Sequence, residues 1–272
     1  MNVTAPSPSK FSSDQDASLA ASTGFARARL GLIIPSSNRL TEPQFRRFTP
    51  PDLGLHVTRL QMTGKHRKPL ADLFDDIARA ASALADADVD LVVFHCTATS
   101  MEEGPEGDAR ILETITRATG RPALSTAQAV SAALKTLAIH RLVMVSPYPQ
   151  SNNDHERAYL SAMGFEVLHD VALGLTSNGY IKVSPQRWIE IVRANARDAA
   201  DGYFLSCTNT TQIDAIAPLE AEFARPFVNS NQATIWAALQ RLREKLAPFT
   251  PAAELGQLVQ KGTDKIKESW AR

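Results

Sequence analysis

A short pattern occurs twice in the sequence, and each copy contains one of the chain's two cysteines. Both copies consist of an acidic turn, a short apolar run and then Cys-Thr followed by small polar residues, at 89–100 and 200–211. Cys96 and Cys207 lie 111 positions apart, close to half of the chain that follows a polar leader. Internal duplication is the simplest explanation. It predicts two similar α/β units that place the two thiols face to face.

Each cysteine lies just past the predicted end of a strand. Open α/β sheets bind their ligands at the carboxyl ends of strands. The residues after each cysteine can begin a helix, whose N–H groups favour a thiolate. Free cysteines in a chain of this size are more often inert core residues, but this shared position favours a functional pair.

Strands alternate with helices along the whole chain. The apolar runs predict strands at 29–34, 55–62, 91–95, 142–145, 165–168, 203–205 and 226–228. Helical spacing of apolar residues predicts helices at 70–84, 108–119, 125–137, 153–163, 185–198, 214–224 and 231–246. Such alternation implies parallel sheets with crossover connections. We therefore expect an α/β fold of two pseudo-symmetric lobes, each a parallel sheet flanked by helices, with the active site in the cleft between them.

The predicted boundaries divide the chain into four parts. Residues 1–26 are polar and read as a disordered leader. The first lobe spans 27–137, with the helix at 231–246 as a candidate to complete it, and the second lobe spans 138–246. Residues 247–272 form an amphipathic extension, either a helix that lies on a lobe or a second subunit, or a solvated tail.

Composition limits the partners. Lys plus Arg and Asp plus Glu number 29 each, so the net charge of zero gives no indication of a nucleic-acid or membrane partner. No signal peptide and no run of about 18 apolar residues is present, so we expect a cytoplasmic protein with reduced thiols. Nucleotide-binding glycine loops and zinc motifs are also missing from the sequence, so we expect no cofactor and no metal. A homo-oligomer remains open.

Two opposed thiols can do two kinds of chemistry on a small carboxylate. They can remove a proton from one face of a carbon and return one to the other, or one thiol can add to a double bond while the other manages the proton. Both schemes need donors that hold a carboxylate or enolate. The candidates lie near strand ends: Ser36, Asn38, Thr97, Ala98, Tyr148, Asn178, Thr208 and Asn209.

Several candidates also have a purely structural interpretation. Asn38 can simply close a turn, and Thr97 and Thr208 can be helix caps. His95 is better explained as a hydrogen-bonded histidine at a strand end than as a base.

Five motifs together resemble the aspartate/glutamate racemase superfamily, in its branch of maleate cis-trans isomerases and arylmalonate decarboxylases. They are Pro35-Ser36-Ser37-Asn38, Cys96-Thr97-Ala98-Thr99-Ser100, Val145-Ser146-Pro147-Tyr148, Leu173-Gly174-Leu175 with Asn178, and Leu205-Ser206-Cys207-Thr208. The resemblance covers 27–246 and implies two α/β lobes with the substrate buried between them.

The resemblance also implies roles for single residues. Cys96 matches the cysteine that adds to the alkene, giving a succinyl-like thioether whose C2–C3 bond can rotate, and Cys207 matches the one that manages the proton. Asn38, Tyr148 and Asn178 match residues that bind the carboxylates. Arylmalonate decarboxylases have glycine at the first cysteine position, so Cys96 favours isomerase or racemase chemistry.

These observations predict a cofactor-independent cis-trans isomerase of a small maleate-like carboxylate, with Cys96 as nucleophile and Cys207 as acid/base. Three alternatives stay open. They are a two-base racemase of a 2-substituted carboxylic acid, an arylmalonate-type decarboxylase, and a carboxylate-binding protein without catalytic activity.

Overall fold

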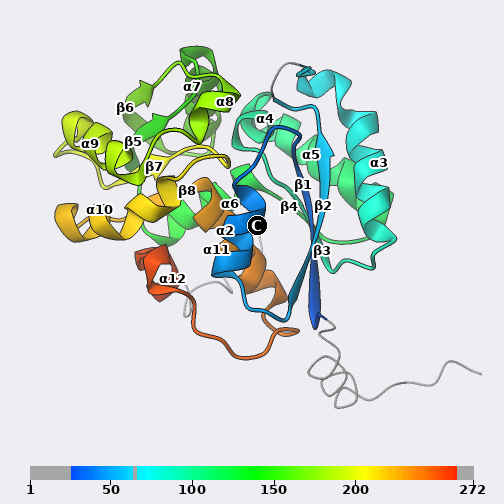
Figure 1. The fold of residues 1–272 in the computed structure, drawn as a ribbon. Coiled ribbons are helices and arrows are strands. Elements are labelled where there is room, and N and C mark those ends of the chain that lie inside the picture. The colour runs from blue at the N-terminus through cyan, green and yellow to red at the C-terminus, as the bar shows by residue number, and fades with distance from the viewer. Residues whose placement is uncertain (1–25, 64–65, 262–272) are drawn as a thin grey trace, which may run out of the picture.

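Two parallel four-stranded sheets with the same topology form the frame of the protein. The computed structural model describes residues 26–63 and 66–261. The first sheet has the order β2-β1-β3-β4 and the second the order β6-β5-β7-β8. The strands are β1 (Ala28–Pro35), β2 (Leu53–Leu60), β3 (Leu91–Phe94), β4 (Ala123–Ser125), β5 (Arg141–Ser146), β6 (Glu166–Ala172), β7 (Gly202–Leu205) and β8 (Phe227–Asn229). This repeated topology confirms the predicted pair of α/β lobes (Figure 1).

Helices connect the strands. The α-helices are α2 (Thr41–Phe48), α3 (Phe74–Ala85), α4 (Thr97–Met101), α5 (Gly104–Thr119), α6 (Thr126–Thr136), α7 (Gln150–Ala162), α8 (Ser177–Tyr180), α9 (Pro185–Asn195), α10 (Ile216–Phe223), α11 (Ser230–Leu242) and α12 (Gln257–Lys261). Short 3₁₀ turns lie at Leu70–Asp72, Gln212–Ala215 and Ala253–Leu255. The sequence did not predict α2, because it contains only two large apolar residues. Phe45 and Phe48 are both buried, so tertiary packing stabilises this helix.

The central strand pair ends at the same point in both sheets. Strand β1 pairs with β3 up to Ile33 and Phe94, and β5 pairs with β7 up to Val145 and Leu205. One further backbone hydrogen bond follows in each case, from His95 N–H to the Ile33 carbonyl (2.8 Å) and from Ser206 N–H to the Val145 carbonyl (2.9 Å). The next residue is a cysteine in both sheets, so the duplication places the two thiols at equivalent strand ends.

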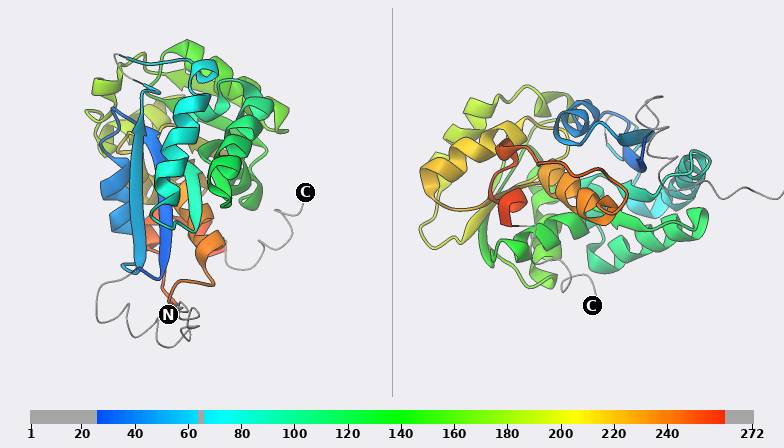
Figure 2. Two further views of the ribbon diagram at one scale, coloured as in Figure 1. Left: turned by 90° about the vertical axis from the view of Figure 1, so that its right-hand side faces the viewer. Right: turned by 90° about the horizontal axis from the view of Figure 1, so that it is seen from below.

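The two faces of the first sheet are buried in different cores. Leu30, Leu32 and Ile34 belong to a large core that continues into the second lobe. Ile33 points the other way, into a smaller core formed with α3 and α5. Figures 1 and 2 show α3 and α5 on the side of this sheet that faces away from the second lobe.

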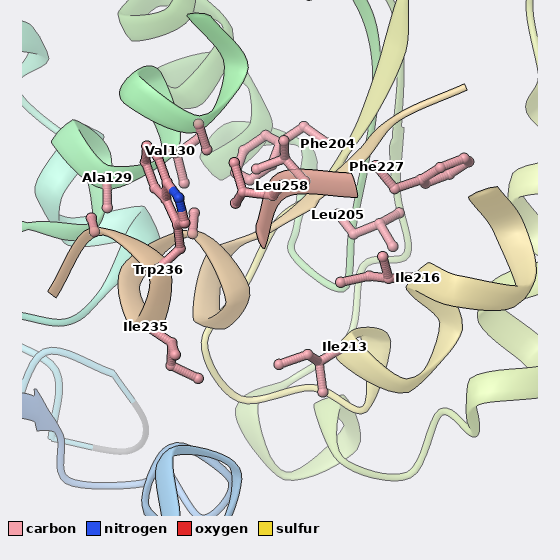
Figure 3. Close-up of a cluster of buried hydrophobic side chains, with 14 of the residues drawn as sticks. Ala129, Val130, Phe204, Leu205, Ile213, Ile216, Phe227, Ile235, Trp236 and Leu258 are labelled. Atoms are coloured by element: carbon pink, nitrogen blue, oxygen red, sulfur yellow. The ribbon is translucent and has the colours of Figure 1, made fainter. Parts of the chain in front are cut away.

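The large core joins the two lobes around α6 and α11, which follow the equivalent strands β4 and β8. Trp236 of α11 is 2% exposed, and Val130 of α6 and Phe204 of β7 are fully buried in the same cluster. Figure 3 shows these side chains together with Leu258 of α12. One continuous core therefore fixes the position of one lobe relative to the other.

Part of the predicted C-terminal extension packs on this core. Leu255, Leu258 and Val259 are all buried in it. Ile266 and Trp270, like residues 1–25 of the predicted leader at 1–26, lie outside the described residues. In the described part of the chain, no helix combines the length and apolar character needed to cross a membrane.

Replacing Gly202 with alanine should destabilise the protein. A Cβ at this position would lie 2.7 Å from the Pro226 carbonyl oxygen and 2.7 Å from Ile139 Cδ1. Such overpacking costs about 1–3 kcal/mol, which equilibrium unfolding in urea would measure. Gly179→Ala is the control, because its new Cβ would meet Leu175 Cβ at 3.4 Å, an ordinary contact. Equal stability of the two variants would show that β7 shifts freely at its start.

Candidate active site

Cys96 and Cys207 line the same small cavity, at the carboxyl ends of β3 and β7. Each residue is 3% exposed. The cavity has a volume of about 20 Å³, and one water needs about 10–15 Å³, so it has room for about one water. Its lining residues are Pro35, Ser37, Asn38, Thr63, Cys96, Ala98, Tyr148, Tyr180, Cys207, Thr208 and Asn209.

A larger hollow adjoins this cavity. It has a volume of about 690 Å³ and shares Thr63, Ala98, Tyr148 and Tyr180 with the lining of the small cavity. The rings of Tyr148 and Tyr180 contact each other edge to face, with their centroids 5.6 Å apart. These shared side chains separate the hollow from the thiols.

Cys96 is the residue that precedes α4. Its thiol donates a hydrogen bond to Thr99 Oγ1 over 3.2 Å. Burial raises the pKa of the Cys96 thiol, while hydrogen bonds with the Thr99 hydroxyl and backbone N–H oppose that rise. The thiol is therefore protonated in the empty cavity, and Thr99 is the neighbour that favours its thiolate.

Cys207 has an unusual backbone conformation. Its φ of 127° lies in a region that non-glycine residues rarely adopt. The Cys207 N–H donates to Ser230 Oγ (3.1 Å), and the Asn209 N–H donates to Cys207 Sγ (3.3 Å). Burial raises the pKa of this thiol to about 12, against hydrogen bonds from the Tyr148 hydroxyl and the Asn209 N–H. Cys207 is therefore protonated at neutral pH.

Asn38 lines the cavity, but its side-chain amide is fully engaged. Its Nδ2 donates to the Thr208 carbonyl and to Thr208 Oγ1, both over 3.1 Å. Its Oδ1 accepts from the backbone N–H groups of Leu40 (3.0 Å) and Thr41 (2.9 Å). An asparagine side chain has two donor hydrogens and two acceptor lone pairs, and all four are used here. In this conformation Asn38 joins the second lobe to the start of α2.

Three of the predicted site residues lie outside the small cavity. Ser36 is exposed, and the neighbouring Ser37 occupies the cavity wall in its place, because the chain turns after Pro35. Thr97 is buried behind the wall, where its Oγ1 donates to Ser230 Oγ over 2.8 Å. Asn178 lies in the lining of the larger hollow. Of the remaining predicted binding residues, Ala98, Tyr148, Thr208 and Asn209 all line the small cavity together with Asn38.

His95 is a structural residue. It is fully buried, with Nδ1 2.9 Å from Thr126 Oγ1 and Nε2 2.7 Å from Asn231 Oδ1. Burial lowers its pKa to about 4, so the ring is neutral. Asn231 in turn donates from Nδ2 to the Thr208 carbonyl over 3.1 Å. The histidine therefore helps to orient the turn that carries Cys207.

Sequence reasoning missed four residues of the site. Ser230 and Asn231 follow β8 directly, and their position after a strand end was a usable signal. Thr63 and Tyr180 come from connections far from either cysteine, and no local pattern marks them. Within the described residues, no cluster of three or more His, Cys, Asp or Glu side chains could hold a metal ion.

The arylmalonate decarboxylase family model matches residues 30–253 of the chain. The chain belongs to this family. A maleate isomerase from Pseudomonas putida is 27% identical over 239 residues, covering 83% of this chain and 95% of the relative. The family membership confirms the resemblance inferred from the five sequence motifs.

Two solved structures of relatives have the same fold. A Pseudomonas putida maleate isomerase variant with maleate gives a TM-score of 0.78 at 25% identity, covering 86% of this chain and 98% of that chain. A mutant of the Nocardia farcinica maleate cis-trans isomerase, with a covalently bound succinylcysteine intermediate, gives a TM-score of 0.76 at 22% identity, with coverage of 86% and 98%. The family fold therefore extends over almost the entire length of both relatives.

Thr99→Val should make Cys96 harder to ionise. The substitution keeps the shape of the side chain but removes the hydroxyl that lowers the pKa of this thiol. We expect the thiolate of Cys96 to appear at higher pH than it does with Thr99 in place. Ultraviolet absorbance measures this thiolate, with Cys207→Ser in both proteins so that only Cys96 titrates. Thr114→Val is the control, because Thr114 is half-buried on α5 and its hydroxyl donates to the Arg110 carbonyl of the same helix. An unchanged Cys96 titration in Thr99→Val would rule out this role of the hydroxyl.

Proposed function

We propose that this protein is a cofactor-independent cis-trans isomerase of a small maleate-like dicarboxylate. The observation that carries the proposal is the pair of cysteines, which come from equivalent strand ends and line one cavity. The maleate isomerase relatives support it, one of which was solved with a covalently bound succinylcysteine intermediate. We also propose a cytoplasmic location, where both thiols stay reduced.

Cys96 first loses its proton to solvent, and as a thiolate it then adds to one alkene carbon of the substrate. A sulfur–carbon bond forms, and the neighbouring carbon takes a proton from the Cys207 thiol. The negative charge thereby moves from Cys96 to Cys207. The pKa of Cys207, about 12, means that this thiol carries its proton when the first step begins.

In the second step the new single bond between the two carbons rotates. The Cys207 thiolate then removes a proton from the carbon that received one, the sulfur–carbon bond breaks, and the trans alkene leaves. Cys96 is again a thiolate and Cys207 a thiol. The cycle consumes no proton and transfers no electrons to an acceptor, so it needs no cofactor.

The substrate carboxylates need hydrogen-bond donors in the cavity wall. Asn209 provides one, because its Nδ2 is buried and has no hydrogen-bond partner within the described residues. Ser37 and Thr208 add hydroxyl groups to the same wall. Substrate binding also requires the cavity to expand, and the Tyr148–Tyr180 pair is the part of the wall that opens toward the larger hollow.

Decarboxylation and racemisation are the competing reactions, since the family takes its name from arylmalonate decarboxylase. Decarboxylation with one cysteine as the proton donor leaves Cys96 without a role. Racemisation would use both thiols as bases without a covalent adduct. A requirement for Cys96 therefore separates the decarboxylase from the other two activities, and a covalent adduct separates the isomerase from the racemase.

Cys96→Ser and Cys207→Ser should each reduce maleate-to-fumarate conversion by several orders of magnitude, because a hydroxyl is a far weaker nucleophile and acid at neutral pH. Proton NMR in deuterium oxide measures the conversion, and circular dichroism checks the fold. We further expect Cys207→Ser to accumulate a maleate adduct on Cys96, visible as a mass increase of the intact protein. Wild-type turnover in either variant would exclude the proposed roles. Deuterium exchange at an sp³ carbon of a 2-substituted acid, with no adduct, would instead indicate a racemase.

A further inference from the structure

Glu156 of α7 is a fully buried carboxyl group close to the cysteine pair. Its exposed fraction is 0%, and neither of its carboxylate oxygens has a hydrogen-bond partner within the described residues. The hydroxyl of Ser206, the residue before Cys207, is buried and also lacks a hydrogen bond of normal geometry. An unpaired buried carboxylate is very costly, so burial favours the protonated form of this group.

The surroundings of Glu156 contain acids and thiols. Cys96 and Glu102 lie at the two ends of α4, and Ser206 and Cys207 lie in the turn after β7. The loop after β5 contributes Tyr148, which interacts with the Glu156 charge.

Further titratable groups around α7 belong to α5, to β6 and to the connection after β2, whose Arg67 lines the larger hollow with Ser151 of α7 and forms an ion pair with Glu102 over 2.8 Å. Asp108 of α5 interacts with Tyr159. Asp170 of β6 forms an ion pair with Arg157 over 3.0 Å, so this guanidinium already has a partner. Burial raises the pKa of Glu156 to about 8, and the Ser206 hydroxyl opposes that rise.

The charge of the site explains why this proton matters. During the proposed reaction one thiolate is always present, next to two substrate carboxylates. Among the described residues, those that line the small cavity include no lysine or arginine. A negative charge on Glu156 raises the pKa of Cys96 and that of Cys207, so it would work against the thiolate in either position.

We propose that Glu156 is a positioning residue that works in its protonated form. While Glu156 is neutral, the thiolate of Cys96 or Cys207 is the only negative charge that the described protein residues place at the cavity. When Glu156 ionises, it suppresses formation of the thiolate. The consequence for turnover rests on the proposed isomerase function, whereas the effect on the thiols does not.

The test is a titration of the thiolate by its ultraviolet absorbance, corrected with the Cys96→Ser, Cys207→Ser double variant. In Glu156→Gln, whose side chain stays neutral, we expect the thiolate to appear at lower pH than in the wild-type protein. Glu156→Met, which is neutral and apolar, should give the same shift even if the glutamine variant folds poorly. Asp154→Asn is the matched control, an exposed carboxylate on the same helix, and should titrate like the wild type. Wild-type titration in both Glu156 variants would overturn the proposal.

Turnover gives a second readout. Below pH 8, the pKa of Glu156, kcat/KM of the wild-type protein for maleate should rise by about tenfold per pH unit, because Cys96 has to lose its proton. Above pH 8 this rise should level off, because Glu156 ionises. In Glu156→Gln the rise should continue above pH 8. A shifted titration without maleate turnover would support the role of Glu156 and count against the isomerase. Maleate turnover with an unshifted titration would support the isomerase and count against the role of Glu156.

Discussion

Three hydrogen bonds to a single carbonyl group hold the two halves of the candidate site together. The Thr208 carbonyl accepts from Asn38 Nδ2 (3.1 Å), Asn231 Nδ2 (3.1 Å) and Thr41 Oγ1 (3.3 Å). Breaking these hydrogen bonds would leave buried polar groups without partners, which costs the full desolvation free energy of those groups. The turn after β7 therefore stays fixed against the first lobe. This constraint lets Cys207 keep its strained backbone and places its thiol in the cavity that Cys96 also lines.

The burial that brings the thiols together also makes them difficult to ionise. The structure partly offsets this with local donors: Thr99 for Cys96, and Tyr148 with the Asn209 N–H for Cys207. None of these donors carries a positive charge. Neutral donors stabilise a negative charge less than a cation does, so a second negative charge near the thiolate would be unfavourable. For this reason the buried Glu156 has to remain protonated.

The sequence predicted the fold well wherever burial alone decides the pattern. Strands such as β3 and β7 are buried on both faces and read as continuous apolar runs. Prediction was poorer at the edges. Strand β6 extends to Ala172, beyond the predicted end at Leu168, because an edge strand with half-buried residues contains His169 and Asp170 as well as apolar residues. Helix α8 has no buried residue, and its four residues give no periodic signal.

The sequence by itself determined the alternation of strands and helices, the duplication and the position of both cysteines at strand ends, because these follow from local apolar patterns and from a repeated motif. Only the tertiary structure decided which side chains reach the cavity. It placed Ser37 in the wall beside an exposed Ser36, used up the amide of Asn38 in a contact with Thr208, and brought Tyr180 next to Tyr148. Side-chain direction in a loop depends on backbone turns and on contacts between segments more than 100 residues apart, such as Asn38 and Thr208, and no local pattern encodes those contacts.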